Sequence, residues 1–201
     1  MINTFRFFHV VVSSPSDGLS EREAVERVIR RINRMLELMG KPYRLAFKDQ
    51  KSIRPEAGNP QSVADKQLQI KKCHIFIGIF GLRFGSAPGL NRPMDGSPYL
   101  SGTEKEIEDA FAAQIQNNGK RPSIMLYRKD VPTPAGMTAE QVKQYYRVIE
   151  FFEKCQAGEK HPAFYYSFNP DEIEQKLEEH ILQTCVEHEK EWLEENPVSH
   201  G

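Results

Sequence analysis

Short apolar segments alternate with segments of helical periodicity along the whole chain, and this alternation is what most constrains the fold. Five segments are short, rich in β-branched or aromatic residues and bounded by turn-forming residues, which is typical of buried strands. They cover residues 5–14, 43–47, 73–81, 123–127 and 163–168. The intervening and following segments repeat apolar residues at three- and four-residue spacing, which predicts helices. They cover residues 20–39, 61–72, 101–116, 139–155 and 172–195.

A strict strand–helix alternation predicts a parallel sheet with helices on both faces and right-handed crossovers. The strands at 5–14 and 73–81 are the most apolar, so we expect them in the middle of the sheet, where helices cover both faces. The predicted fold is α/β, with a five-stranded parallel sheet of order 2-1-3-4-5 and strand 1 or 3 central. No shift in composition divides the chain, so we expect one domain over residues 1–195, with 196–201 as a tail or the start of a linker.

Composition excludes several classes of function. The formal net charge of -1 gives no general attraction to nucleic acid or to acidic membranes, so neither is an expected partner. No run approaches the ~20 apolar residues of a membrane span, and Arg6 and His9 interrupt the first apolar run, which argues against a signal peptide. The three cysteines form no Cys-x-x-Cys pair and the histidines are scattered, so no metal site or disulfide framework is indicated. We expect a cytoplasmic protein.

The common nucleotide and hydrolase motifs are missing from the sequence. It has neither a Gly-x-x-x-x-Gly-Lys-Ser/Thr loop nor a Gly-x-Gly-x-x-Gly turn after the first strand, and it has no Gly-x-Ser-x-Gly elbow. Gly78, Gly81 and Gly85 around the end of the third strand are spaced wrongly for either phosphate motif. They allow close packing and turns there, or close approach of a ligand.

The end of the third strand, the glycine- and proline-rich loop that follows and the next helix start mark the expected site. Ligands of open α/β sheets bind beyond the carboxyl ends of the strands. Ser13 and Ser14 end the first strand at the same edge, where their hydroxyl groups would bind a sugar or phosphate, or begin a turn. Arg83 would hold a phosphate or carboxylate, or form a structural ion pair with Glu104 or Glu106.

Two helix starts carry the pattern of a capping box, in which a Ser and a Glu three positions later bond reciprocally to the backbone. Ser20 and Glu23 predict the start of the first helix, and Ser101 and Glu104 predict the start of the third. Capping explains Glu104 without a functional role. Glu106 lies beyond the cap on the stripe of Thr103 and Ala110, so it is either a surface glutamate or a functional carboxylate.

Three segments together resemble a known family. They are residues 10–17 (VVVSSPSD, with Glu-Arg-Glu at 21–23), 75–85 (IFIGIFGLRFG) and 101–110 (SGTEKEIEDA). They resemble the domain-of-unknown-function 4062 family, a divergent branch of the TIR-like domains. The resemblance implies a flavodoxin-like three-layer sandwich. It also implies an N-terminal effector module of STAND- or NACHT-type signalling ATPases, including prokaryotic antiviral defence proteins, fused to or partnered with a larger protein.

The resemblance also implies an activity. Many TIR domains hydrolyse NAD with a glutamate in the helix after the third strand, and Glu106-Ile107-x-x-Ala110 matches the second half of that motif. Gly102 stands where the family usually has an aromatic residue. By this resemblance Glu106 is catalytic, NAD or a related nucleotide is the substrate, and no cofactor or metal is needed. The nucleotide-binding residues would be Ser13, Ser14, Asp17, Arg83, Ser101 and Thr103.

The same resemblance implies self-association through TIR-like surfaces, with residues 48–60 as a loop that gates it. Two other functions stay open. One is a non-catalytic module that only self-associates or recruits a partner, which the missing aromatic residue favours. The other is an enzyme like the nucleoside deoxyribosyltransferases, which also use a glutamate on a similar fold.

Overall fold

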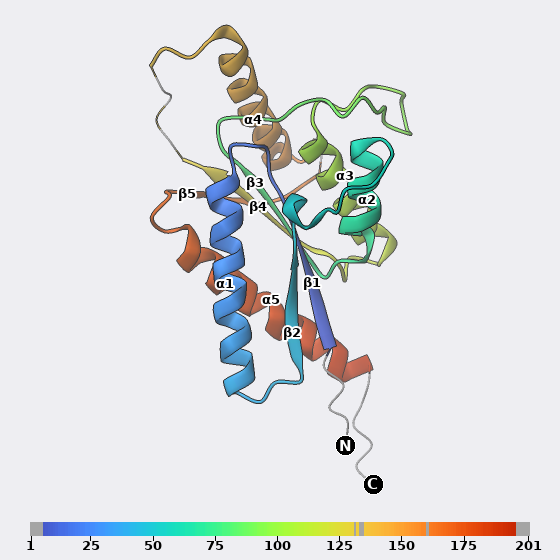
Figure 1. Ribbon diagram of the computed structural model, residues 1–201, viewed down its shortest axis with the longest axis vertical. Coiled ribbons are helices and arrows are strands. Elements are labelled where there is room, and N and C mark those ends of the chain that lie inside the picture. The colour runs from blue at the N-terminus through green and yellow to red at the C-terminus, as the bar shows by residue number, and fades with distance from the viewer. Residues whose placement is uncertain (1–5, 131, 133–134, 160, 196–201) are drawn as a thin grey trace.

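The computed structural model describes residues 6–130, 132, 135–159 and 161–195, and within them it contains a five-stranded parallel sheet (Figure 1). Its order is β2-β1-β3-β4-β5, as the alternation predicts. The strands are β1 (Arg6–Ser13), β2 (Tyr43–Lys48), β3 (Ile75–Phe80), β4 (Ser123–Lys129) and β5 (Tyr165–Phe168). β1 and β3, the two most apolar predicted strands, are both interior, which confirms the prediction from their composition.

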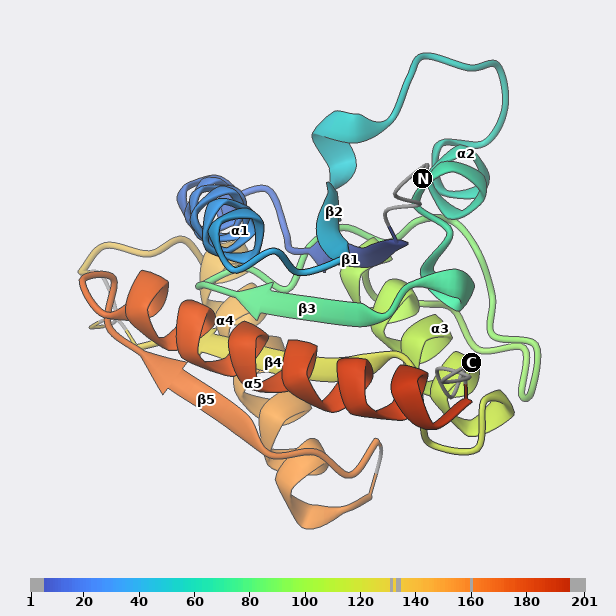
Figure 2. The same cartoon turned by 90° about the horizontal axis from the view of Figure 1, so that it is seen from below.

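Helices cover both faces of the sheet and complete a three-layer α/β fold (Figures 1 and 2). The helices are α1 (Leu19–Leu38), α2 (Pro60–Leu68), α3 (Gly102–Gln116), α4 (Ala139–Ala157) and α5 (Ile173–Glu195). α1 and α5 pack on the face formed by Val10, Val12 and alternate residues of β3. α2, α3 and α4 pack on the other face, formed by Val11 and Phe76 among others. Two consecutive side chains of a strand point to opposite faces, so β1 supplies both cores.

The predicted start of the first helix is wrong by one residue, and its predicted cap is absent. α1 begins at Leu19 after Gly18, and no side chain caps it. The Ser20 hydroxyl donates to the adjacent Glu21 carboxylate instead. The cause is the tight turn before the helix, where the Gly18 N–H donates to the Pro15 carbonyl at 3.0 Å and already sets the entry of the chain.

The predicted cap of the third helix is confirmed at Ser101, whose hydroxyl accepts the Glu104 N–H at 2.9 Å. The reciprocal bond differs, because Glu104 accepts the N–H of Leu100 rather than that of Ser101. The same carboxylate pairs with Arg92 at 2.7 Å. Glu104 therefore has a structural role, although not the one that the capping box predicts.

Other boundaries differ at element ends. The predicted helix over 61–72 is split by Gln69, whose left-handed φ of 55° ends α2 and leads into a short 3₁₀ turn, Ile70–Lys72. Cys73, Cys155 and Cys185 are buried free thiols. Within the described part of the chain, no helix has the length and apolar character needed to cross a membrane.

Candidate functional site

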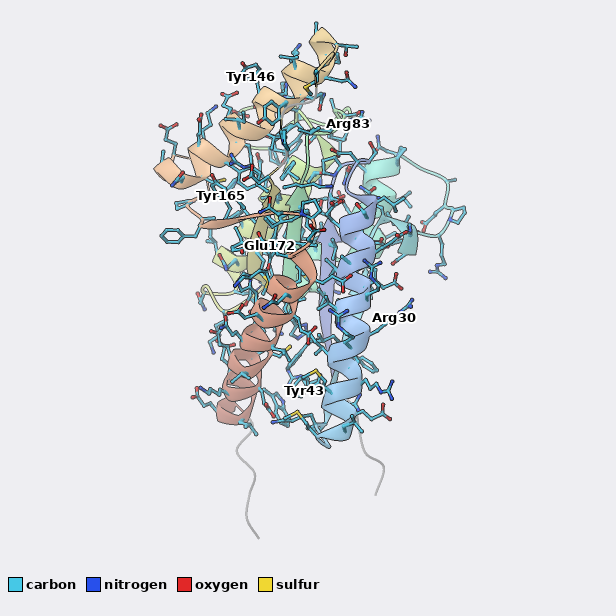
Figure 3. All side chains as sticks on the ribbon, turned by 90° about the vertical axis from the view of Figure 1, so that its left-hand side faces the viewer. Arg30, Tyr43, Arg83, Tyr146, Tyr165 and Glu172 are labelled. Carbon is cyan, nitrogen blue, oxygen red and sulfur yellow. The ribbon has the colours of Figure 1, made fainter. Side chains whose placement is uncertain are left out.

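The strand order reverses between β1 and β3, because β2 lies on one side of β1 and the later strands lie on the other. In open parallel sheets such a switch point leaves a crevice at the carboxyl edge. A pocket of about 370 Å³ lies there, between the β1–α1 loop, the β3–α3 loop and the starts of α2 and α3. Ser14, Gln61, Arg83, Gly102 and Thr103 are among its lining residues. Arg83 lies toward the opposite end of the molecule from Tyr43, the first residue of β2 (Figure 3).

Glu106 is buried directly behind this pocket, with 1% of its surface exposed. The Ser13 hydroxyl donates to Glu106 Oε2 at 2.5 Å, and Gln61 Nε2 donates to Glu106 Oε1 at 3.2 Å. Burial raises the pKa of Glu106 above its ordinary value of 4.5, while the hydrogen bonds from Ser13 and Gln61 oppose that rise. The interpretation of Glu106 as a surface glutamate is therefore wrong.

Close packing between α3 and the sheet brings Glu106 to Ser13. Ser13 pairs in register with Gly78 of β3. A Cβ on Gly78 would lie 2.9 Å from Leu126 of β4 and 3.4 Å from Ile107 of α3, so the glycine leaves room for both side chains at this strand. Since Glu106 precedes Ile107, the helix delivers its carboxylate to the end of β1.

Ser14 lines the pocket, but its hydroxyl is occupied. Arg22 Nη1 donates to Ser14 Oγ at 2.6 Å and also to the carbonyls of Ser14 and Pro15. The buried Arg22 lies 3.9 Å from Asp49, which is buried too. Ser14 was expected either to bind a sugar or phosphate or to begin a turn, and these contacts favour the turn. Ser13, in contrast, contacts Glu106, the candidate catalytic residue.

Asp17 is exposed and ties the first-strand loop to the end of β3. Its Oδ2 accepts the N–H groups of Leu82 and Arg83 at 3.0 and 3.1 Å. A Cβ on Gly81 would lie 2.7 Å from that oxygen, which explains the glycine as a point of close packing. Through these bonds Asp17 holds the backbone of Arg83, which lines the pocket.

The predicted structural ion pair of Arg83 is wrong. Glu104 pairs with Arg92, and Glu106 bonds Ser13 and Gln61, so neither carboxylate meets Arg83. The Arg83 side chain is exposed at the carboxyl edge of the sheet. It lines both the pocket over Glu106 and a second cavity of about 700 Å³ that extends to the start of α4.

The two remaining predicted residues lie at the start of α3. Ser101 is buried and its hydroxyl caps the helix, while Thr103 is buried and lines the pocket. Gly85 has a φ of +105°, and a Cβ added to it would lie 3.1 Å from Ser101 Cβ. Of the seven predicted residues, Ser14, Arg83 and Thr103 line the pocket, and Ser13 and Glu106 bond to each other behind it. Asp17 lines the larger cavity, and Ser101 caps α3.

Sequence reasoning missed Gln61, the pocket residue that bonds Glu106. A polar residue in the first turn of a helix after a polar loop is ordinary, so its local sequence carries no signal. One indirect signal was present at Gly102, where the resemblance to TIR-like domains leads one to expect an aromatic side chain. A Cβ on Gly102 would lie 2.8 Å from Gln61 Oε1, so the Gln61 side chain occupies the space beside this glycine.

In the part of the chain that the structure describes, no three His, Cys, Asp or Glu side chains gather in a group that could hold a metal ion. What the site offers is a carboxylate, a hydroxyl group and a carboxamide in contact, with an exposed guanidinium at the rim. Such a set can stabilise developing positive charge and bind sugar hydroxyls and phosphate.

Residues 9–182 match the family model described as "Domain of unknown function (DUF4062)". The chain belongs to the DUF4062 family. Among solved structures, the DUF4062 chain is similar to "BT4096 a gut microbial diltiazem-metabolizing enzyme", at 11% identity and a TM-score of 0.36. That match covers 88% of this chain and 40% of the other, so it spans less than half of that protein. No curated protein matches the sequence.

Proposed function

We propose that this DUF4062 domain cleaves the N-glycosidic bond of NAD or a related nucleotide, with Glu106 as the carboxylate that faces the ribose. One observation carries the proposal. A carboxylate is held 2.5 Å from the Ser13 hydroxyl at the carboxyl end of a central strand, immediately behind a pocket at the switch point of the sheet. Ligands of doubly wound sheets bind at that point.

The chemistry fits a single carboxylate. When the bond between nicotinamide and ribose breaks, nicotinamide leaves with the bonding electron pair and C1′ becomes oxocarbenium-like. An ionised Glu106 stabilises that positive charge, and water then adds to C1′ and gives up its proton to the carboxylate or to solvent. Burial favours the neutral form of Glu106 before binding, and the positive charge of the nicotinamide ring favours the ionised form.

The two cavities support a dinucleotide over a single nucleoside. Both share Arg83 and Ser86 as lining residues, so the guanidinium lies between them. In our proposal the ribose to be cleaved occupies the smaller cavity, the diphosphate lies at Arg83, and the second nucleoside occupies the larger cavity. Arginine suits this position because its fork of N–H groups matches phosphate oxygens.

A non-catalytic interaction module is the second candidate, and a specific observation favours it. Gln61 covers the Glu106 carboxylate, so Glu106 does not line the pocket in this conformation. By the resemblance to TIR-like domains, we extend the catalytic proposal to a domain that acts when assembled, as an effector in prokaryotic defence or signalling.

The test is release of free nicotinamide from NAD, measured by chromatography on concentrated protein and on protein clustered by fusion to an oligomeric scaffold. We expect turnover by the parent, none by Glu106→Gln, and full activity in Glu37→Gln, a charge-matched control at an exposed site on α1. A parent that stays inactive even when clustered would favour the interaction module. Equal activity in Glu106→Gln and parent would show that another group does the chemistry.

A further inference from the structure

Gln61 contacts Glu106 from the pocket side, and the structure shows how that contact is held. Its side chain is half-buried, lines the 370 Å³ pocket and donates from Nε2 to Glu106 Oε1 at 3.2 Å. Of the described pocket-lining residues, it is the one whose side chain bonds Glu106. Any ribose that reaches the carboxylate from the pocket therefore meets Gln61 first.

The Gln61 backbone is fixed while its side chain has a second partner. The Asn59 side chain caps α2 and accepts the Gln61 N–H at 3.0 Å, and Pro60 occupies the first helical turn. Gln61 Nε2 also donates to Asp65 Oδ1, one turn along the helix, at 3.1 Å. The amide can therefore leave Glu106 by side-chain rotation and keep a hydrogen bond, without movement of the helix.

Gly102 leaves the space that the Gln61 side chain occupies while it bonds Glu106. A Cβ there would lie 2.8 Å from Gln61 Oε1, the far end of a flexible side chain, and the next nearest atom is Gln61 Cδ at 3.8 Å. An alanine at 102 would therefore displace Gln61 rather than the backbone. Gly102 begins α3, and its N–H donates to the Ser86 carbonyl, a bond that alanine keeps.

We propose that Gln61, seated against Gly102, is a latch that closes the free protein over Glu106 and that a ligand must displace. It is a positioning residue, because it acts through Glu106 and not on the reacting atoms. The inference deepens the proposed function, since it says how access to the same carboxylate is controlled. It also gives Gly102 a role in place of the usual aromatic residue.

The first test needs no nucleotide. A water-soluble carbodiimide with an amine labels accessible carboxyl groups, and peptide mass spectrometry reports the yield at Glu106. We expect Gln61→Ala and Gly102→Ala each to raise that yield about tenfold, which corresponds to about 1.4 kcal/mol for loss of one hydrogen bond to the carboxyl group. The double variant should gain no more than either single variant, because both substitutions remove the same contact.

Gln67→Ala is the matched control, since Gln67 lies on the same helix and bonds Arg54 and Glu56 rather than Glu106. Its labelling at Glu106 should equal that of the parent, and thermal unfolding should show that all variants fold. Unchanged labelling in both Gln61→Ala and Gly102→Ala would overturn the latch. So would a yield in the double variant equal to the product of the two single effects.

A kinetic readout separates the latch from the proposed function. With NAD as substrate, Gln61→Ala should lower KM and leave kcat unchanged, because only the closed state of the free protein is lost. A lowered kcat with unchanged KM would overturn the latch in favour of a direct role in the reaction. If the parent shows no turnover, the labelling result still supports or overturns the latch, and only the proposed reaction fails.

Discussion

Replacing Glu106 by glutamine should remove part of the loss of folding stability that the parent shows as the pH rises from acidic to neutral and alkaline values. Burial raises the pKa of Glu106 above 4.5, so the folded state holds the proton more tightly than the unfolded state does. This tighter proton binding stabilises the folded state in full below pH 4.5, and the stabilisation is lost as the pH rises through the folded-state pKa of Glu106. The Glu106→Gln variant has no titrating group at this position, so its stability does not fall with pH for this reason.

The size of the effect follows from proton linkage. Between pH 4.5 and the folded-state pKa, the parent loses up to about 1.4 kcal/mol per pH unit relative to Glu106→Gln. For a chain of this size, about 1 kcal/mol shifts the melting temperature by roughly 2–4 °C. The difference in melting temperature between the two proteins should therefore widen by up to about 3–6 °C per pH unit in that window, and then become constant.

The assay is urea or thermal unfolding of both proteins at closely spaced pH values from 4 upward, with Glu37→Gln as the exposed control. Glu37→Gln should follow the parent curve, because that side chain is exposed in both states. A constant difference between Glu106→Gln and parent across the whole range would refute the reasoning, since it would mean that Glu106 titrates alike in the folded and unfolded states.

Three further outcomes follow from the packing around the site. Gly78→Ala should lower the free energy of unfolding by about 1–3 kcal/mol in urea titrations, because its Cβ would lie 2.9 Å from Leu126, and a parental value would contradict the close packing. Arg83→Ala should change that free energy by less than about 0.5 kcal/mol, as at other exposed sites, but weaken NAD binding in calorimetry; unchanged affinity would remove Arg83 from the site. Glu104→Ala should cost about 1–3 kcal/mol, because the partly buried Arg92 loses one of its two carboxylate partners and the Leu100 N–H loses its acceptor, and it should retain turnover.

Most of the fold could be predicted from local sequence patterns. Sheet order and the interior places of β1 and β3 follow from the alternation and from apolar runs, which are properties of short segments. The burial of Glu106 also had a local signal. Positions 103, 106, 107 and 110 share one helical stripe, and two of them, Ile107 and Ala110, are core residues.

The contacts between side chains that define the site could not be predicted from any local sequence pattern. Gln61 and Glu106 are 45 positions apart, and the Asp17 carboxylate meets the backbone of Leu82, 65 positions away. Such contacts depend on how closely α2, α3 and the loops pack against the sheet, which in turn depends on single glycines such as Gly78 and Gly81. Sequence reasoning can mark those glycines but cannot say which side chain each one admits.

The central claim is that the ribose of a nucleotide reaches the carboxylate of Glu106. A crystal structure of Glu106→Gln with NAD tests it most directly, because this variant should bind without turnover and keeps the shape of the side chain. The account predicts a ribose within hydrogen-bonding distance of the side chain at position 106, with Gln61 rotated away and the diphosphate at Arg83. NAD bound elsewhere, or no bound NAD and Gln61 still covering position 106 at saturating nucleotide, would contradict it.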